Sequence, residues 1–417
     1  MKMWACTITV FVLVLGFVPA GVARPAEGHA APAAAIPLAV STFDSNAEGW
    51  TVIGDVVSAP TYHASGGNPG GYLSVTDQAD GETWFWSAPA KFLGNKSAAY
   101  GGVLRYDLRQ APDDAQYQEY DVILEGAGLR LVLEVTYTPG TIWTSYVAIL
   151  DQRAGWFKDD GTDNPPTAGE MQAVLASLTA LRIRGEYQIG DDTGDLDNVR
   201  LEGPSAPPWQ MLAGPTAIYL AGRSDVTIPP FGGDLSGFPL WRNCTDLPCD
   251  NYLLEQFPLF HPAVGGMRFI FRATGGVDYY GNPHGRIGPD GTPGTESYID
   301  ALDGISGYSG PHGSLVGVFL NAANPKNGTP PGPLVNNTSF STLSPALGQV
   351  FFIGDGLTGT GTGTPQTFFA PFGSTRLFLG IADAASFAGP PGWYDDNYGS
   401  FWVQVMQYKI YLPVIIR

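Results

Sequence analysis

Apolar and polar residues alternate with a period of two in many short stretches of this chain. Leu104, Tyr106 and Leu108, for example, alternate with charged residues. The same pattern recurs at 129–137 and 181–184 in the first half, and at 267–272, 376–381 and 401–406 in the second. Successive side chains of a strand point to opposite faces of a sheet, so this period is typical of half-buried strands in antiparallel sheets.

One stretch departs from this pattern. Thr167 is followed three residues later by Glu170, ahead of the apolar run from Met171 to Leu178. Thr-x-x-Glu before an apolar run is a capping box, in which each side chain satisfies a backbone N–H at the start of a helix. The sequence therefore predicts a single short helix in the first half of the chain.

The composition agrees with a chain of many short strands. It contains 55 Gly and 35 Pro, which suits tight turns between strands. The segment Pro204-Ser205-Ala206-Pro207-Pro208 cannot form a central strand and is expected to be a linker. We therefore expect an all-β fold with two antiparallel β-sandwich domains. The expected segments are an export signal at 1–23, an Ala/Pro-rich linker at 24–40, a first domain at 41–203, a Pro-rich linker at 204–212, a second domain at 213–407, and a short apolar tail or strand at 408–417.

The first residues predict export. Lys2 precedes an apolar run from Ile8 to Val18, and Gly21-Val22-Ala23 offers a small-residue cleavage site. A membrane anchor is the alternative, but the run is short for a bilayer and no second long apolar run follows. We expect a secreted protein, outside the cell or at its surface, with no membrane span once the signal is removed.

The net charge excludes some classes of partner, and the cysteine content indicates a disulfide. The formal net charge of −18 argues against binding to nucleic acid or to anionic membranes, both of which need basic patches. Cys6 is lost with the signal, and Cys244 and Cys249 are expected to form a local disulfide. A zinc half-site is the alternative, but it requires two further ligands that are not evident.

The most distinctive chemistry lies at residues 392–401, with Asp383 shortly upstream. Several carboxylate and amide oxygens gather there between the end of one predicted strand and the start of the next. Calcium prefers such a set of hard oxygen ligands in a flexible loop. The alternative is a solvated turn, since Asp and Asn are common turn residues.

This loop resembles the calcium-site loop of the pseudomonad galactophilic lectins, most clearly in Asn397-Tyr398-Gly399-Ser400-Phe401. The resemblance implies side-chain ligands from Asp383, Asp396 and Asn397, with backbone carbonyl ligands from Tyr280 and Trp393. The loop from Asp383 to Trp393 is longer than in that family, and Asp396 replaces an Asn. The histidine and glutamine that contact sugar in the family have no clear counterpart here.

The same resemblance implies a carbohydrate ligand, of galactose type in that family, on the bound calcium. Asp383 and Asp396 would contact both ion and sugar, and Trp393 or Tyr394 would stack on the sugar's C–H face. The alternative for both aromatic residues is core packing or a turn anchor.

The first domain resembles the laminin B (laminin IV type A) domain along its whole length. The matching blocks include Phe43-Asp44-Ser45 near its start, residues 62–72, and Leu196-Asp197-Asn198-Val199 at its end. The resemblance implies an extracellular jelly-roll sandwich without enzymatic activity. Sandwiches of this kind often carry a structural calcium between first and last strands, which here implicates Asp44 and Asp197, with Glu48 or Asp195 as possible contributors.

Two questions remain open from the sequence. Trp84 and Trp86 share one strand face, where they form either a sugar platform or part of the core. Enzyme motifs such as His-Glu-x-x-His and Gly-x-Ser-x-Gly are missing from the sequence, although a glycosidase carboxylate pair has no linear signature. We expect a non-catalytic, calcium-dependent carbohydrate-binding protein. The alternatives are a structural or adhesion protein whose calcium only stabilises loops, and an accessory module of a polysaccharide-degrading system.

Overall fold

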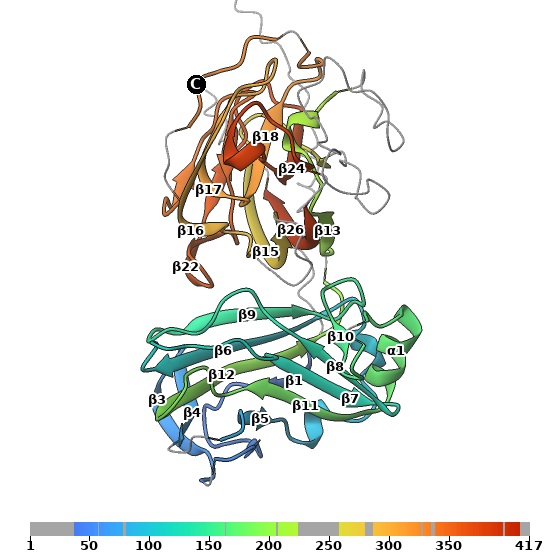
Figure 1. Ribbon diagram of the computed structural model, residues 1–417, viewed down its shortest axis with the longest axis vertical. Coiled ribbons are helices and arrows are strands. Elements are labelled where there is room, and N and C mark those ends of the chain that lie inside the picture. Colours follow the sequence, from blue (N-terminus) through green and yellow to red (C-terminus); the bar gives the residue numbers. More distant parts are fainter. Residues whose placement is uncertain are drawn as a thin grey trace, which may run out of the picture.

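Two β-sandwiches, one formed by each half of the chain, make up the computed structural model (Figure 1). The structure describes residues 37–223, 258–279, 287–394 and 397–408, apart from residues 57, 78–80, 163, 206, 327 and 335–337. Nearly all strand pairs are antiparallel, so the predicted all-β fold is confirmed. The export signal, residues 24–36 of the first linker, Cys244, Cys249 and residues 409–417 lie outside the described residues.

Two six-stranded sheets form the first domain. The first sheet contains β3 (Thr61–Gly67), β4 (Gly70–Asp77), β12 (Asp192–Glu202), β6 (Val103–Ala111) and β9 (Thr144–Ile149), with β1 (Pro37–Ser41) also paired to β12. The second contains β10 (Phe157–Lys158), β8 (Leu129–Leu133), β7 (Val122–Gly126), β11 (Leu178–Arg184), β5 (Phe85–Ser87) and β2 (Thr51–Ile53). Because β1 pairs with β12, residues 37–40 belong to the first domain, although they were expected to be part of a linker.

The two sheets bury their apolar faces against each other. Trp84 and Trp86 are both completely buried, with their rings in an edge-to-face contact at 5.2 Å. They belong to the core of the first domain. The core alternative is therefore correct for these two residues, and the sugar-platform alternative is wrong.

The predicted helix is present as α1 (Ala168–Ala176). The Thr167 side chain accepts from the backbone N–H of Glu170, and the Glu170 side chain accepts from the backbone N–H of Thr167. Its buried side chains are Met171, Val174 and Leu175. The helix ends before Leu178, because Leu178 already begins β11. The first domain also contains the short 3-10 helices η1 (Ala90–Phe92) and η2 (Ser97–Ala99). The second contains η3 (Ile218–Leu220) and η5 (Ala385–Phe387).

Two details of the period-two pattern differ from expectation. β8 ends at Leu133, so Val135 and Tyr137 lie beyond the strand. Arg184 was expected on a polar face but is fully buried. Its guanidinium donates to the carbonyl oxygens of Glu186 (2.6 Å) and Tyr117 (2.9 Å) and stacks on the Tyr117 ring, which compensates for the lost hydration of the charge.

The second domain is built on two main sheets. One contains β13 (Gln210–Ala213), β26 (Tyr398–Tyr408), β15 (Arg268–Asp278), β23 (Thr367–Phe369) and β19 (Thr342–Leu343), and the other β14 (Leu259–Pro262), β24 (Arg376–Ile381), β18 (Leu315–Leu320) and β20 (Val350–Phe352). Smaller sheets are β17 (Tyr308–His312), β16 (Thr292–Ile299) and β25 (Ala388–Gly389), and the hairpin β21 (Leu357–Gly359) and β22 (Thr362–Pro365). Since β13 pairs with β26, residues 210–212 form a strand rather than part of the linker.

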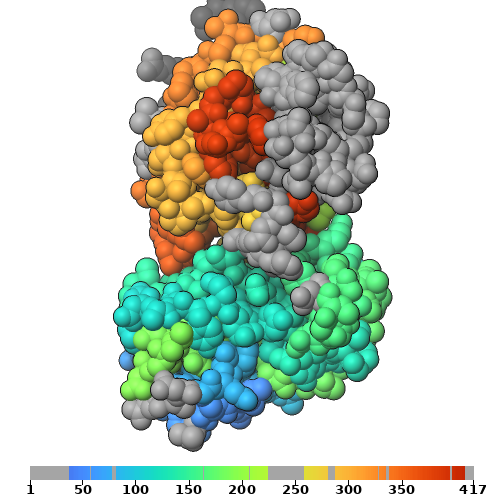
Figure 2. All heavy atoms as spheres, in the orientation of Figure 1, coloured from blue at the N-terminus to red at the C-terminus, as the bar shows by residue number. Residues whose placement is uncertain are grey.

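The two domains contact each other directly (Figures 1 and 2). Val103 and Ile149 of the first domain form one apolar cluster with Trp402 of the second and Trp209 of the linker. The Ser145 N–H donates to the carbonyl oxygen of Gly361, 2.8 Å away, at the tip of the β21–β22 hairpin. The glycine-rich run at 354–364 therefore forms a hairpin that docks on β9.

Among the helices of the described residues, none combines the length and the apolar character that a bilayer span requires.

Candidate functional sites

The predicted calcium loop of the second domain is fastened by one buried tyrosine. Asp383 follows β24 and Asn397 precedes β26; their exposed fractions are 3% and 0%. The Tyr394 hydroxyl donates to the carbonyl oxygen of Ile381 and accepts from the Asp383 N–H, both at 3.0 Å. The Asn397 N–H points back to the Tyr394 carbonyl oxygen at 3.4 Å. Two of the three predicted side-chain ligands, Asp383 and Asn397, are thus anchored to the same loop.

Asn397 carries the clearest sign of a ligand site in this loop. Its Nδ2 donates to the carbonyl oxygen of Gly214 at 3.3 Å, but its Oδ1 is buried and has no hydrogen-bond partner among the described residues. A buried acceptor left in this state costs about 1–3 kcal/mol. A hard cation would satisfy that oxygen, so this residue fits the predicted calcium site. Tyr280 and Asp396 lie outside the described residues.

The two aromatic residues of this loop differ in exposure. Trp393 adopts a left-handed backbone conformation (φ 68°) and is 36% exposed. Tyr394 is completely buried, so the expectation that its ring stacks on a sugar is wrong. Its hydroxyl serves as the loop anchor, which is the alternative that the sequence left open. Asp278, which the sequence interpretation missed, is a buried carboxylate paired across the sheet with Tyr398, next to Asn397.

The structure also brings together the two predicted carboxylates of the first domain. Asp197 is fully buried, and its oxygens accept from the backbone N–H groups of Asn68 (2.6 Å) and Asn198 (2.7 Å). Burial, and then the nearby charges of Asp107 and Asp44, raise the pKa of Asp197 to about 6. Both oxygens of Asp197 therefore already have donors. An ion between Asp44 and Asp197 stays a prediction.

The two residues left open as contributors to that ion are engaged elsewhere. Glu48 accepts from the backbone N–H of Phe43 at 2.7 Å and pairs with Lys91. Asp195 pairs with Arg109 at 2.6 Å. Glu48 is therefore already engaged, whereas the Oδ1 of Asp195 is buried and has no hydrogen-bond partner among the described residues, so Asp195 can still contribute an oxygen.

A different carboxylate group in the first domain was missed by the sequence analysis. Asp55, Asp77 and Glu186 place carboxylate oxygens within 4.8 Å of one another. Burial, and then the charges of Asp192, Asp77 and Asp55, raise the pKa of Glu186 to about 7. Long separations in the chain hide this group, because no local spacing links residues 55, 77 and 186.

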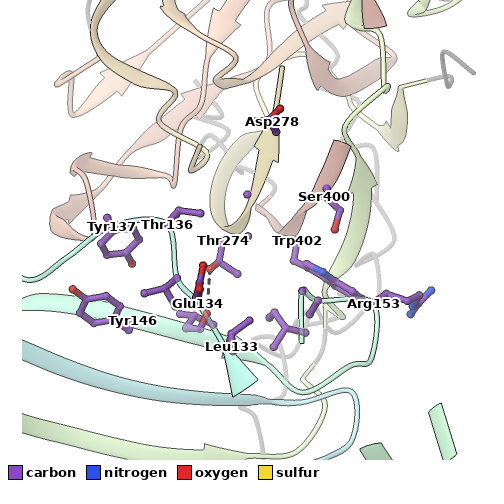
Figure 3. A pocket seen from close by; sticks show the side chains of 18 of the residues that line it. Leu133, Glu134, Thr136, Tyr137, Tyr146, Arg153, Thr274, Asp278, Ser400 and Trp402 are labelled. Carbon is purple, nitrogen blue, oxygen red and sulfur yellow. Dashed lines mark hydrogen bonds between the residues drawn. The ribbon is translucent and has the colours of Figure 1, made fainter. Parts of the chain in front are cut away.

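A cavity of about 190 Å³ lies between the two domains (Figure 3). Glu134, Thr136 and Tyr137 line it from the first domain, and Ser400 and Trp402 from β26 of the second. Charged, hydroxyl and aromatic side chains thus meet in one space at the domain boundary.

A second cleft at the same boundary, of about 400 Å³, is lined by residues of both domains. It collects Arg105 and Arg200 of the first domain, Arg272 of the second, and the rings of Trp143 and Trp209. Arg105 pairs with Glu202 at 3.2 Å, and burial, followed by the nearby Arg272, lowers the pKa of its guanidinium. Asp107 and Asp355 line the same cleft, so cationic, anionic and aromatic side chains meet there, a combination that suits hydroxyl-rich or anionic ligands.

Comparison with known proteins supports the laminin B resemblance of the first domain. The family model described as Laminin B (Domain IV) matches residues 85–210. Laminin subunit gamma-1 of Xenopus tropicalis is 35% identical over 187 residues, which are 42% of this chain and 11% of that protein. The basement membrane-specific heparan sulfate proteoglycan core protein of Mus musculus is 31% identical over 109 residues, 25% of this chain and 3% of that protein. The chain spans about a tenth or less of the length of these relatives.

Solved structures resemble the chain only distantly. The L4b domain of human laminin alpha-2 covers 39% of this chain and 96% of its own, at 14% identity and a TM-score of 0.32. A family 11 carbohydrate-binding module of a Clostridium thermocellum cellulase covers 40% and 95%, at 14% identity and a TM-score of 0.27. At these scores neither likeness carries an argument about function.

Proposed function

We propose that this chain is an extracellular, non-catalytic protein that binds saccharide through a calcium-organised loop in its second domain. The observation that carries the proposal is the buried Oδ1 of Asn397, which has no hydrogen-bond partner among the described residues, in a loop that also buries Asp383. The extracellular setting is supported by relatives that are laminin subunits and a basement membrane proteoglycan core protein.

The loop residues have distinct roles in this proposal. Asp383 and Asn397 would hold calcium through side-chain oxygens, and the lectin resemblance adds Asp396 and the carbonyl oxygens of Tyr280 and Trp393. Bound calcium supplies open coordination positions for two neighbouring sugar hydroxyls. The Asp383 carboxylate accepts hydrogen bonds from those hydroxyls. The exposed part of the Trp393 ring provides an apolar face for the sugar's C–H groups.

Galactose-type sugars are the expected ligands on the strength of the resemblance alone. A single shallow site of this kind should bind with a Kd of ~0.1–1 mM, so useful avidity would come from several sites on one surface.

The arginine-lined cleft between the domains supports a second saccharide surface. Arg272 is exposed there, and Trp143 and Trp209 add aromatic faces. Arg272→Ala should weaken binding of acidic glycans and leave the calcium dependence of neutral glycans unchanged. Equal binding of acidic glycans by this variant would exclude the cleft.

A glycan array probed with and without a calcium chelator tests the proposed function. We expect binding that disappears with chelator and returns when calcium is added back. Asp383→Ala should abolish it, whereas the control Asp300→Ala, which removes an exposed carboxylate of the same domain, should retain it. Glycan binding that persists in chelator would contradict the calcium-dependent mechanism.

The alternative functions have their own outcomes in the same assays. If no glycan binds at any calcium concentration, the saccharide proposal is wrong. A fall in the melting temperature in chelator that Asp383→Ala abolishes would then favour the structural or adhesion function. Hydrolysis of a polysaccharide by the purified protein would contradict the non-catalytic assignment. Binding only to a polysaccharide that a partner enzyme degrades would favour the accessory module.

A further inference from the structure

Three carboxylates from separate segments of the first domain converge. Asp55 follows β2, Asp77 ends β4, and Glu186 lies between β11 and β12. One oxygen of each lies within 4.8 Å of the others. Since β2 and β11 belong to one sheet and β4 to the other, the group joins the two sheets of the sandwich.

These carboxylates are shielded from water. The exposed fractions of Asp77 and Glu186 are 2% and 5%. Both carboxylate oxygens of Asp55 are buried and have no hydrogen-bond partner among the described residues. Asp192 stands directly opposite Asp77 on the neighbouring strand and is 2% exposed. Its Oδ2 accepts from Gln110, while its Oδ1 is also buried without such a partner in the described part of the chain.

The donors that the structure shows for Glu186 and Asp192 are neutral. The backbone N–H of Trp84 donates to Glu186 Oε2 at 3.2 Å. Within the described residues, Asp55, Glu186 and Asp192 form no ion pair with a lysine or arginine. Arg184 is nearby in sequence, but its guanidinium faces carbonyl oxygens, including that of Tyr117. Buried carboxylates without a counter-charge either take up protons or bind a cation.

The chemistry of the ligands favours one cation. The three oxygens lie within 4.8 Å of one another, close enough to share a single ion, and Ca²⁺ accepts several carboxylate oxygens at about 2.3–2.6 Å. The group supplies carboxylate oxygens and neither nitrogen nor sulfur, which disfavours zinc and copper. A dry site also disfavours Mg²⁺, because that ion retains several of its waters.

We propose that Asp55, Asp77 and Glu186, supported by Asp192, bind a Ca²⁺ ion that ties together the two sheets of the first domain. This site is separate from the Asp44–Asp197 pair and from the loop of the second domain. It involves no sugar, so it makes the stability of the first domain, rather than saccharide binding, depend on calcium.

Calorimetric titration of the full chain with Ca²⁺ tests this site. The parent carries Asp383→Ala, which removes a ligand of the proposed loop site. We expect the parent to bind Ca²⁺, and Asp55→Asn and Glu186→Gln each to weaken this binding at least about tenfold, since even supporting residues of metal sites contribute about 10–100-fold. Glu82→Gln is the matched control, because Glu82 is an exposed acid close in sequence to Asp77 and its change should leave the affinity unaltered.

Thermal melting gives a second result, which carboxylates that do not bind Ca²⁺ would not produce. In chelator, Asp55→Asn and Glu186→Gln should melt higher than the parent, because each removes one of the repelling charges. In saturating Ca²⁺ the order should reverse, because the parent gains the bound ion. This reversal supports the site. Either variant alone can show it, so the test remains decisive if the other folds poorly.

Two outcomes would overturn the inference. One is unchanged Ca²⁺ affinity in both variants, which would place any ion elsewhere. The other is a parent that binds no Ca²⁺ at pH 8. Neither outcome affects the proposed function, since glycan binding is measured on chains that retain Asp383, and we expect Asp55→Asn to leave it unchanged.

Discussion

Trp402 of β26 should control whether the two domains behave as one unit. Its side chain is 4% exposed and packs with Val103 and Ile149 across the domain boundary and with Trp209 of the linker. The guanidinium of Arg153, also from the first domain, lies 5.3 Å from the centre of the Trp402 ring. Trp402→Ala removes the second domain's member of this cluster while leaving the backbone pairing of β26 intact.

The size of the effect follows from the burial of this ring. A buried tryptophan removes about 150–250 Å² from water, and Trp→Ala in a packed site costs about 3–5 kcal/mol. Each kcal/mol shifts the melting temperature of a domain of about 150–250 residues by about 2–4 °C. We therefore expect the second domain to melt roughly 6–20 °C lower in the variant.

Differential scanning calorimetry measures this change. The variant should show two separated transitions, because the first domain loses a contact but keeps its own core. Small-angle scattering should show a larger radius of gyration, since the cluster no longer holds the domains together. Phe372→Ala is the control, because that side chain is 97% exposed in the same domain. If Trp402→Ala melts like the unmodified protein, the inferred coupling through this cluster is wrong.

Three further predictions concern the first domain. Thr167→Ala removes the helix cap and should lower the free energy of unfolding by about 1 kcal/mol, as measured by denaturant unfolding. The control Gln172→Ala, on the exposed face of the helix, should lower it much less. Burial raises the pKa of Asp121 to about 7, so its contribution to stability is complete below about pH 4, its unfolded value, and is lost as the pH rises to about 7. Asp121→Asn should reduce that loss by up to roughly 4 kcal/mol, and an unchanged pH profile would contradict the assignment. Gly185→Ala should destabilise the domain by about 3 kcal/mol or more, because the new Cβ would overlap the Trp84 ring; melting close to that of the unmodified protein would show that the ring can move aside.

The sequence predicted best what depends on local spacing. The period-two stretches located strands such as β6 and β15, because one buried face imposes alternation along the chain. The capping box located α1 for the same reason, since its hydrogen bonds join residues three apart. Arg184 was misplaced because its burial depends on carbonyl oxygens and rings from another part of the fold, which alternation does not report.

In the candidate sites, too, the sequence revealed residues that are close along the chain and missed residues that only the fold brings together. Asp383 and Asn397 were found because they lie near each other in a recognisable loop. Asp55 and Glu186 were missed, since their proximity arises only when the two sheets pack together. The glycine-rich run before Pro365 gave no strand pattern, and its hairpin depends on docking Gly361 against the neighbouring domain.

A crystal structure of the protein grown with calcium tests the central claim most directly. The account predicts anomalous density for an ion bound by Asp383 and by the Oδ1 of Asn397, with open coordination positions toward solvent near Trp393. A map in which the Asn397 oxygen contacts only water or protein, with no ion in the loop at saturating calcium, would contradict it.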